Sequence, residues 1–452
     1  MADQSIHGMW SSRLMFVLAA AGSAVGLGNI WRFPYVAGEN GGGAFVLVYL
    51  GCIALIGFPI VMAEIVLGRE GRKSPINTMA DLAKRSRRST IWQAVGWMGA
   101  GTGFIILSVY SVIAGWVMAY VIRMASGDLA GADSGSAGAA FDGFTQDAGS
   151  VLGWHTLFMI LTMFIVARGV GRGIEVAVKY LMPALFFLLL MLVGYSVVTT
   201  GPAFGEGLAF MFSFKFDQLT WAAVLLAMGQ AFFTLSLGMG TMMTYGAYMP
   251  AGASIPGTAA MVAILDTTVA ILAGIIIFPL VFANDLTGSA GPGLMFVTLP
   301  IAFGQMTGGQ IFGTAFFLLV SFAAITSSIS MIEPACAWLV EKTGFRRPMV
   351  AVILGVIAWV LGLGSALSFN LWSDVQLLGG LNFFESMDYL ANNIMLPLGG
   401  MLIALFIGWM VDKSIVRQQM AVSEGGLLFF LWIVRVVAPA AVFVVFVMTL
   451  LG

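Results

Sequence analysis

The sequence predicts an all-α protein that crosses a lipid bilayer eleven times, and three features of the chain support this fold class. Hydrophobic residues make up 60% of the chain and charged residues only 9%, far below the roughly 25% charged residues of soluble domains. Eleven apolar runs are long enough to cross about 30 Å of hydrocarbon. Glycine-rich breaks interrupt the first and sixth runs, at residues 22–29 and 236–240. Interrupted helices at corresponding places in two halves are typical of secondary transporters whose binding site lies at mid-membrane.

The apolar runs follow one another along the whole chain. They cover residues 12–37, 43–69, 91–124, 152–168, 176–199, 219–247, 257–283, 309–340, 348–367, 386–411 and 427–450. Several exceed 25 residues, so these helices must tilt, bend or protrude. The first run is too long for a removable signal peptide and lacks a small-residue cleavage site, so we interpret it as a membrane helix. We expect one transmembrane transporter domain over residues 1–452. Its hydrophilic stretch 126–150, rich in Gly, Ala, Ser and Asp, predicts a flexible outer loop.

The basic residues indicate how the chain is oriented, because positive charge is retained on the cytoplasmic side of the membrane. The loop after the second run and the alternate loops beyond it hold 15 of the 20 lysines and arginines. We therefore expect a multi-pass protein of the bacterial inner membrane, with a cytoplasmic N-terminus and an external C-terminus. The net charge of -1 indicates no nucleic-acid partner, and no obligatory protein partner is evident. The two cysteines, Cys52 and Cys336, fall inside apolar runs, so no disulfide framework is implied.

Charged residues within membrane spans mark functional sites, because burying a charge in hydrocarbon is costly. Five are present: Arg32, Glu64, Asp266, Glu333 and Asp388. Structural roles stay open for four of them. Glu64 would bond the backbone of the unwound first helix, Glu333 would bond carbonyls freed by Pro334, and Arg32 and Asp388 would be ordinary interfacial residues. Asp266 lies near mid-depth, where a lone carboxylate needs a cation or a proton.

Hydroxyl groups in the eighth run offer ligands to that kind of cation. Na⁺ is a hard ion that prefers oxygen ligands. Thr326 and Ser327 are adjacent, so they point about 100° apart on a helix, and both can flank one ion held between their helix and the broken first one. The alternative is that these hydroxyls bond back to their own helix.

Four segments resemble the neurotransmitter:sodium symporter family, in particular its bacterial transporters of leucine and of several hydrophobic amino acids. They are Arg13–Phe45, with Gly-Ser-Ala-Val-Gly-Leu-Gly-Asn-Ile-Trp-Arg-Phe-Pro-Tyr, Gly229–Gly240, Gly291–Pro300 and Thr326-Ser-Ser-Ile. The resemblance covers all eleven spans in order. It implies a five-plus-five inverted repeat, at approximately 10–200 and 219–412, followed by an extra helix at 427–450.

The resemblance also implies two sodium sites. The first would use Ala24, Asn29, Thr234 and Asp266, together with the substrate carboxylate. The second would use carbonyls of Gly22, Val25 and Ala323 with the hydroxyls of Thr326 and Ser327. Only the ligands, and not the number of ions moved per cycle, can be identified from the sequence.

The substrate site follows from the same resemblance. Amides of Gly26, Leu27 and Gly28, near a positive helix end, would bind a carboxylate together with Tyr110. An amine would meet carbonyls of Ala24, Phe233 and Thr234, with Ser236. The side-chain chamber would consist of Ser23, Ile106, Ile113, Phe233, Met239, Ser328 and Met331.

Differences from other family members at three positions narrow the predicted substrate and the predicted ion requirement. Monoamine carriers have Asp where this chain has Gly26, which favours a substrate with its own carboxylate. Members that require chloride hold it in a cage of polar side chains beside the first sodium site. In that cage they have Asn where this chain has Asp266, and Ser or Glu where this chain has Ala270. This chain still offers Tyr49, Gln230 and Thr234 to such a cage. The Asp266 carboxylate supplies the negative charge next to Na⁺, so we expect no chloride requirement. The same group is a candidate for proton antiport on the return step.

The gates complete the implied site. Arg32 and Asp388 match the outer ion pair, with Tyr110 and Phe233 as an aromatic lid below them. At the inner gate this chain has His7 where the family usually has an Arg, opposite Glu341. Because histidine is only partly charged near neutral pH, the ion pair that closes the inner side is expected to be weaker or pH-sensitive.

The sequence thus predicts a sodium-coupled symporter for a neutral, hydrophobic L-amino acid, working by alternating access. A β- or γ-amino acid or a taurine-like substrate stays open, as does an amino-acid sensor without transport. A channel is disfavoured by the bulky Trp31, Tyr110 and Phe233 around the breaks. An intramembrane enzyme is disfavoured because His7 and His155 are the only histidines and no hydrolase motif is present.

Overall fold

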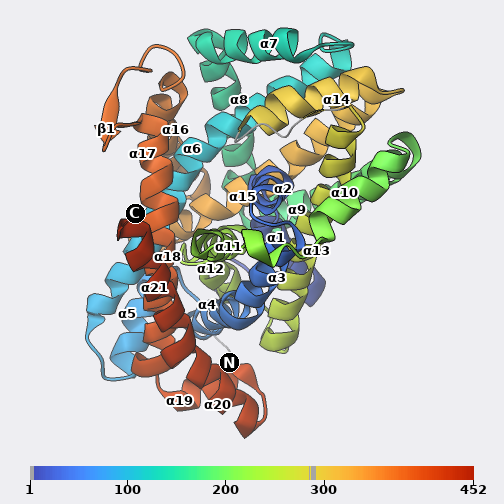
Figure 1. Ribbon diagram of the computed structural model, residues 1–452. Coiled ribbons are helices and arrows are strands. Elements are labelled where there is room, and N and C mark those ends of the chain that lie inside the picture. The colour runs from blue at the N-terminus through green and yellow to red at the C-terminus, as the bar shows by residue number, and fades with distance from the viewer. Residues whose placement is uncertain (1–4, 285, 287–291, 452) are drawn as a thin grey trace.

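The structure is a computed structural model that describes residues 5–284, 286 and 292–451, and it is almost entirely helical (Figure 1). Its elements in chain order are α1 (Arg13–Ala24), η1 (Gly28–Arg32), α2 (Phe33–Glu39), α3 (Gly43–Cys52), η2 (Ile53–Gly57), α4 (Phe58–Gly71), α5 (Pro75–Arg85), η3 (Thr90–Trp92), α6 (Gln93–Ser126), α7 (Ser134–Gln146), α8 (Ala148–Ala167), η4 (Val170–Ile174), α9 (Glu175–Thr199), α10 (Pro202–Phe212), η5 (Phe216–Gln218), α11 (Trp221–Thr234), α12 (Thr241–Ala247), α13 (Ile255–Phe282), η6 (Leu294–Thr298), α14 (Leu299–Gln305), α15 (Gly309–Thr343), α16 (Arg347–Leu367), β1 (Gln376–Leu378), β2 (Leu381–Asn382), α17 (Phe383–Tyr389), η7 (Leu390–Met395), α18 (Leu396–Leu405), η8 (Phe406–Met410), α19 (Lys413–Met420), α20 (Glu424–Trp432), η9 (Ile433–Val437) and α21 (Ala438–Leu451). The two strands form one antiparallel hairpin.

The number of membrane spans is smaller than the sequence predicts when only long helices are counted. Among the described residues, nine helical segments are long and apolar enough to cross a bilayer, and the bent pair Arg13–Ala24 and Gly28–Glu39 makes a tenth. The predicted sixth run does not pass this test because α11 has 14 residues and α12 only seven. The helix lengths alone therefore do not confirm eleven crossings.

The first predicted break is confirmed. Helix α1 ends at Ala24, and Val25 takes an extended backbone conformation before the chain continues into η1, whose hydrogen bonds have the wider π spacing. The two halves of the span are bent by 57°. A π turn inside a helix is often found at a functional site.

The second predicted break is also confirmed, between the end of α11 at Thr234 and the start of α12 at Thr241. Ser236, Gly238 and Gly240 have φ values of 53°, 80° and 73°. This left-handed region costs glycine little and other residues more. The glycines therefore permit an irregular, non-helical turn of the backbone between α11 and α12.

Helices α6 and α15 pack against each other and are the most buried of the long spans. In the most apolar stretches of these two helices, 78% and 83% of the residues are buried. In α8 and in the span that contains α9, the buried share is 33%. The exposed side chains of the outer helices are largely apolar, for example Phe187 and Val198 on α9. This arrangement suits a protein whose outer surface contacts lipid rather than water.

The stretch 126–150 is not the flexible loop that its composition predicts. Residues 134–146 form α7, because Asp133 caps the helix: its Oδ1 accepts from the Ser136 amide at 2.8 Å, and the Ser136 hydroxyl accepts from the Asp133 amide at 3.0 Å. The Ser136 hydroxyl also donates to Asp133 Oδ1 at 2.7 Å, and this bond, followed by the one from the Ser136 amide, holds the pKa of Asp133 below its ordinary value. Phe141 and Phe144 then anchor α7 on Trp116 of α6, with ring centroids 5.6 and 6.5 Å apart.

Helix α12 lies against α4 at unusually short range. A Cβ atom on Gly68 would overlap the Met243 carbonyl oxygen, and one on Gly246 would lie 2.9 Å from the Ile65 carbonyl oxygen. The fully buried Glu64 carboxylate accepts from the amides of Gly238 at 2.9 Å and Met243 at 3.3 Å. Glu64 therefore satisfies the break before α12 and not, as the sequence suggested, the unwound first helix, since its place on α4 brings it to the N-terminal end of α12.

Substituting Gly68→Ala should force α4 and α12 apart, because the added methyl group meets backbone that cannot rotate away. We expect a loss of about 1–3 kcal/mol in stability, the usual range for overpacking, seen as a lower melting temperature of the purified protein in detergent. Gly51→Ala is the matched control, since nothing lies within 4 Å of a Cβ at that position on α3. Equal melting temperatures for the two variants would refute the close contact.

Removing the Glu64 carboxylate should leave two buried amides without an acceptor. Each unsatisfied group costs about 1–3 kcal/mol, so Glu64→Ala should lower the melting temperature markedly. Glu64→Gln should also destabilise, because its amide nitrogen would face one of the two N–H donors. The exposed Glu206 on α10 serves as control, and a Glu206→Gln variant should melt like the unmodified protein. If Glu64→Ala melted like this control, the capping role would be wrong.

Candidate functional site

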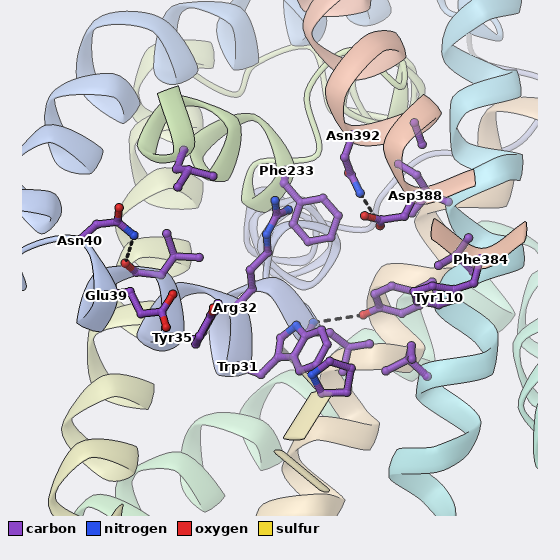
Figure 2. Close-up of a pocket in the computed structure, with 18 residues that line it drawn as sticks. Trp31, Arg32, Tyr35, Glu39, Asn40, Tyr110, Phe233, Phe384, Asp388 and Asn392 are labelled. Atoms are coloured by element: carbon purple, nitrogen blue, oxygen red, sulfur yellow. Dashed lines mark hydrogen bonds between the residues drawn. The ribbon is translucent and has the colours of Figure 1, made fainter. Parts of the chain in front are cut away.

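A cavity of about 450 Å³ opens among α2, α6, α11 and the segment from α17 to η7 (Figure 2). Arg32, Tyr110, Phe233 and Asp388 all line it. The Arg32 guanidinium lies 5.4 Å from the centre of the Phe233 ring, and Asp388 accepts a 2.7 Å hydrogen bond from Asn392. Arg32 and Asp388 thus face the same cavity, but no contact within 4.0 Å joins them in the described part of the chain. The two expected outer gate residues therefore line the same cavity but do not form an ion pair.

A second, much smaller space lies directly below, with a volume of about 10 Å³. Leu27, Ile106, Tyr110 and Phe233 line both spaces and form the partition between them. The lower space, which we call the inner chamber, is lined by Ser23, Ala24, Gly26, Leu27, Gly28, Asn29, Ile106, Tyr110, Phe233, Ser236, Met239, Ser327 and Met331. None of these side chains carries a charge.

Eleven of the fourteen residues that the sequence assigns to the substrate line the inner chamber. Ile113 lines the outer cavity instead. Thr234 lies 3.3 Å from the Tyr49 hydroxyl, and Ser328 bonds to Thr162 on α8 at 2.9 Å, so neither reaches the chamber in the described structure. A helix presents a new face every residue, which explains why Ser328 points away while its neighbour Ser327 points in.

The backbone of the first break is held by side chains from three helices. The Gly26 amide donates to Asn29 Oδ1 at 3.1 Å, and the Leu27 amide donates to the Tyr110 hydroxyl at 3.3 Å. The Gly28 carbonyl accepts from Gln230 of α11 at 2.9 Å. A Cβ at Gly26 would lie 2.9 Å from Ser327 Oγ and 3.1 Å from the Tyr110 hydroxyl. The absence of a side chain at 26 is therefore what lets α6 and α15 approach the unwound segment.

Three of the four residues predicted for the first sodium site, Asn29, Thr234 and Asp266, come together, while Ala24 lines the inner chamber. Asn29 Nδ2 donates to Asp266 Oδ1 at 2.7 Å and to its carbonyl at 3.2 Å. The hydroxyls of Thr234 and Tyr49 lie beside the same carboxylate, which is fully buried. Within the described residues its second oxygen, Oδ2, has no hydrogen-bond partner. A buried carboxylate with a free oxygen is suited to bind a cation.

The residues predicted for the second site form a cluster of five oxygens. The Ser327 hydroxyl donates to the carbonyls of Gly22 at 3.3 Å and Val25 at 3.0 Å. The Thr326 hydroxyl lies 3.1 Å from the Ala323 carbonyl. Thr326 Cβ would be 3.2 Å from a Cβ on Gly22, so glycine at 22 allows this approach of α1 to α15. The set contains hydroxyl and carbonyl oxygens only, which suits a monovalent hard cation.

The end of the bundle that holds the expected inner gate residues is closed by a dense polar network. His7 Nε2 lies 2.9 Å from Glu341 Oε1. Glu341 also accepts from the Ser74 amide and hydroxyl at 2.7 and 2.5 Å, and from Asn77 at 2.5 Å. Trp10 donates to the Tyr245 carbonyl at 3.1 Å. The structure therefore brings the two expected inner gate residues together and adds partners that the sequence did not indicate.

Glu333 does not bond carbonyls freed by Pro334, contrary to the structural alternative drawn from the sequence. Its carboxylate pairs with Arg347 at the start of α16 and accepts from the Tyr248 hydroxyl at 2.9 Å. A carboxylate accepts hydrogen bonds and cannot donate to a carbonyl unless it is protonated. The arginine lies 14 residues further along the chain, beyond any local pattern.

Ser330 is a residue that the sequence analysis missed. Its hydroxyl accepts from Ser23 of α1 at 2.7 Å and donates to the Ser327 carbonyl at 2.7 Å, while its carbonyl lies 3.3 Å from the Thr241 hydroxyl of α12. It thereby ties α1, α12 and α15 together next to the inner chamber. Its position three residues after Ser327, on the same helix face, is the signal that could have identified it.

Comparison with known proteins agrees with this architecture. The chain matches the family described as the sodium:neurotransmitter symporter family over residues 7–138 and 140–452. An uncharacterized sodium-dependent transporter of Bacillus subtilis, YhdH, is 38% identical over 441 residues, which is 97% of this chain and 96% of that protein. One of Haemophilus influenzae is 34% identical over 98% of each chain.

A solved structure is also similar over nearly the whole length. The crystal structure of MhsT in complex with L-phenylalanine has a TM-score of 0.90 and 46% sequence identity, with 98% of this chain and 99% of that chain covered. The matches to the family and to both sodium-dependent transporters cover almost every described element. The chain therefore belongs to the sodium:neurotransmitter symporter family and is a sodium-coupled membrane transporter rather than an enzyme.

Proposed function

We propose that this protein is a sodium-coupled symporter for neutral, mainly hydrophobic L-amino acids, and that it works by alternating access without chloride. The observation that carries the proposal is the lining of the inner chamber, in which the described residues include no charged side chain. An amino acid with a charged side chain would be left unpaired there, at a large energetic cost. The likeness to MhsT, whose structure holds L-phenylalanine, supports a hydrophobic substrate.

The substrate's own charged ends find complementary groups at the two breaks. The Leu27 amide nitrogen and the Tyr110 hydroxyl oxygen are only 3.3 Å apart, so both can donate a hydrogen bond to one substrate carboxylate. The amino group would meet carbonyls near the C-terminal end of α11, where helix carbonyls lack intrahelical partners. Met239 and Met331 at the chamber wall are flexible side chains that can move aside for a large apolar group, which is necessary because the chamber measures only about 10 Å³.

Sodium is part of the cargo, and we assign one ion to each oxygen cluster. At the first, Na⁺ would contact the free Oδ2 of Asp266 together with Asn29, Thr234, the Ala24 carbonyl and the substrate carboxylate. At the second, Na⁺ would lie between the Ser327 hydroxyl oxygen and the carbonyls of Gly22 and Val25, in place of the hydrogen bonds that now join them. Each ion entering across 100 mV gains about 2.3 kcal/mol, so two ions provide several kcal/mol before their concentration gradient is counted.

Asp266 also makes a chloride ion unnecessary. The neighbouring Tyr49, Gln230 and Thr234 could contribute to a chloride cage, but the carboxylate already supplies one negative charge beside the first sodium site. A second anion a few ångströms away would be repelled by it. Gln230 instead donates to the Gly28 carbonyl at 2.9 Å and supports the break.

The open outer cavity and the closed cytoplasmic network correspond to an outward-facing state of an alternating-access cycle. In this proposal α11 and α12 form one interrupted crossing, which restores the eleven spans of the sequence prediction. The two halves, approximately 10–200 and 219–412, are inverted repeats, and the extra helix lies at 427–450. The protein lies in the bacterial inner membrane with its N-terminus in the cytoplasm and its C-terminus outside.

Uptake into proteoliposomes tests the function directly. With an inward sodium gradient we expect saturable uptake of radiolabelled phenylalanine or leucine, and uptake at background when K⁺ replaces Na⁺. Glutamate and lysine should not compete. GABA and taurine should compete poorly, and strong competition by either would replace the proposed substrate class with the β- or γ-amino acid alternative. Sodium-dependent binding without any uptake would indicate a sensor instead of a symporter.

Chloride independence is tested by replacing chloride with gluconate on both sides of the membrane, which should leave uptake unchanged. Asp266→Asn removes the charge and should lower uptake at physiological sodium at least about tenfold, equivalent to roughly 1.4 kcal/mol. Asp266→Glu keeps the charge and serves as the matched control. Wild-type uptake that stops in gluconate would contradict the role assigned to Asp266.

A further inference from the structure

A third cavity, of about 130 Å³, lies beside the outer cavity. It is enclosed by α2, α10, α13 and η6, and Figure 1 shows α10 running alongside the end of α13. Tyr35 and Glu39 line both this cavity and the larger one, and Figure 2 shows these two side chains next to each other at the edge of the larger cavity. The two cavities are therefore adjacent, and Tyr35 and Glu39 lie at the boundary between them.

Four aromatic residues line the third cavity, together with the aliphatic side chains of Ile277, Val281 and Leu294. Phe210 meets Phe278 and Phe282 nearly edge to face, with centroids 5.0 and 5.2 Å apart and interplanar angles of 65° and 87°. Tyr35 completes the set, which we call the aromatic cage. Gly38 gives the rings room, since a Cβ there would lie 3.2 Å from both Phe210 and Phe278. The electron-rich faces of such rings attract cations, and most strongly those that shed water easily.

Glu39 supplies the one negative charge of the cage. It is exposed, and no lysine, arginine or histidine among the described residues lies within 4.0 Å of it. Tyr35 is its neighbour and hydrogen-bond partner one helical turn earlier. An ammonium group already contacts the cage from one side, because Lys215 Nζ lies 5.5 Å from the centre of the Phe210 ring.

We propose that the aromatic cage binds a small organic ammonium cation that enters from the outer cavity and rests between the rings and the Glu39 carboxylate. A metal ion does not fit this chemistry, because one carboxylate among apolar rings offers too few oxygen ligands. An uncharged apolar molecule would contact the rings but gain nothing from the charge of the Glu39 carboxylate, whereas a cation is attracted by both. An alkylated ammonium matches both, since its methyl groups contact the rings while its charge faces Glu39.

Occupation of the cage would affect transport through the helices that build it. Helix α2 continues directly from η1, which carries Arg32, so a ligand that joins α2 to α10, α13 and η6 holds the outer half of the first span in place. Closure of the outer cavity requires that half to move. The bound cation should therefore act as an inhibitor that lowers the maximal rate and leaves substrate affinity nearly unchanged.

Tetramethylammonium chloride is the probe, compared with an equal addition of KCl at constant sodium. We expect it to lower the maximal rate of uptake in proteoliposomes, and to bind the purified protein in isothermal titration with or without amino acid. Phe278→Leu and Glu39→Gln should each raise the inhibitory and dissociation constants at least about fivefold. Asp388→Asn, which removes a charge from the outer cavity only, should leave the dissociation constant unchanged.

The titration separates this inference from the proposed function, because it requires no transport. Binding that is lost in Asp388→Asn but kept in Phe278→Leu would place the cation in the outer cavity and overturn the proposal, as would no binding at all. A Lys215→Ala variant shows whether that side chain competes. If its own ammonium already fills the cage, tetramethylammonium will bind this variant alone, and the proposal of an external ligand fails.

Discussion

The requirement that each backbone polar group find a partner inside the bilayer controls this structure. A continuous helix meets it automatically, whereas each break frees amides and carbonyls where no water can reach them. Most of the partners are side chains from distant parts of the chain: Glu64 for the break before α12, and Tyr110 and Gln230 for the break after α1, where the nearby Asn29 also accepts from the Gly26 amide. The polar residues inside the spans are therefore needed to stabilise the breaks, whose oxygens are the ligands proposed for the ions.

The same requirement explains which features the sequence predicted. Glycines at 22, 26, 28, 238 and 240 weaken a helix locally, so the positions of both breaks could be located without knowledge of the fold. The oxygen clusters came from resemblance to a family, and the structure brings their members together. Local patterns could not show that Glu64 turns to α12, because its partner amide at Gly238 lies 174 residues away. Glu333 was misassigned for a similar reason, and α7 because its Gly- and Ala-rich composition hides the cap at Asp133.

The two ends of the site differ in how they are held. At the inner gate one carboxylate, Glu341, gathers His7, Ser74 and Asn77, so charge and hydrogen bonds act in a small volume. At the outer gate Arg32 faces the ring of Phe233 while Asp388 bonds to Asn392. The cavity of about 450 Å³ that both residues line leaves them apart. In the proposed function, closing the outer side would bring these two charges together above a substrate held next to Tyr110 and Phe233.

In the proposed function, coupling of ion to substrate follows from the charge at Asp266. An ionised carboxylate buried in hydrocarbon is costly without a counter-charge, and Asn29 donates a hydrogen bond to it while the hydroxyls of Thr234 and Tyr49 lie beside it. Sodium would remove that cost and at the same time place a positive charge next to the amides of the first break, where a carboxylate can bind. The substrate carboxylate would then complete the ion's coordination. Each ligand lowers the free energy of the other, and linkage requires this preference to be reciprocal. In the proposed symporter the substrate carboxylate is a ligand of the ion, so the substrate should bind weakly without Na⁺, because its carboxylate would then lie near the uncompensated charge of Asp266.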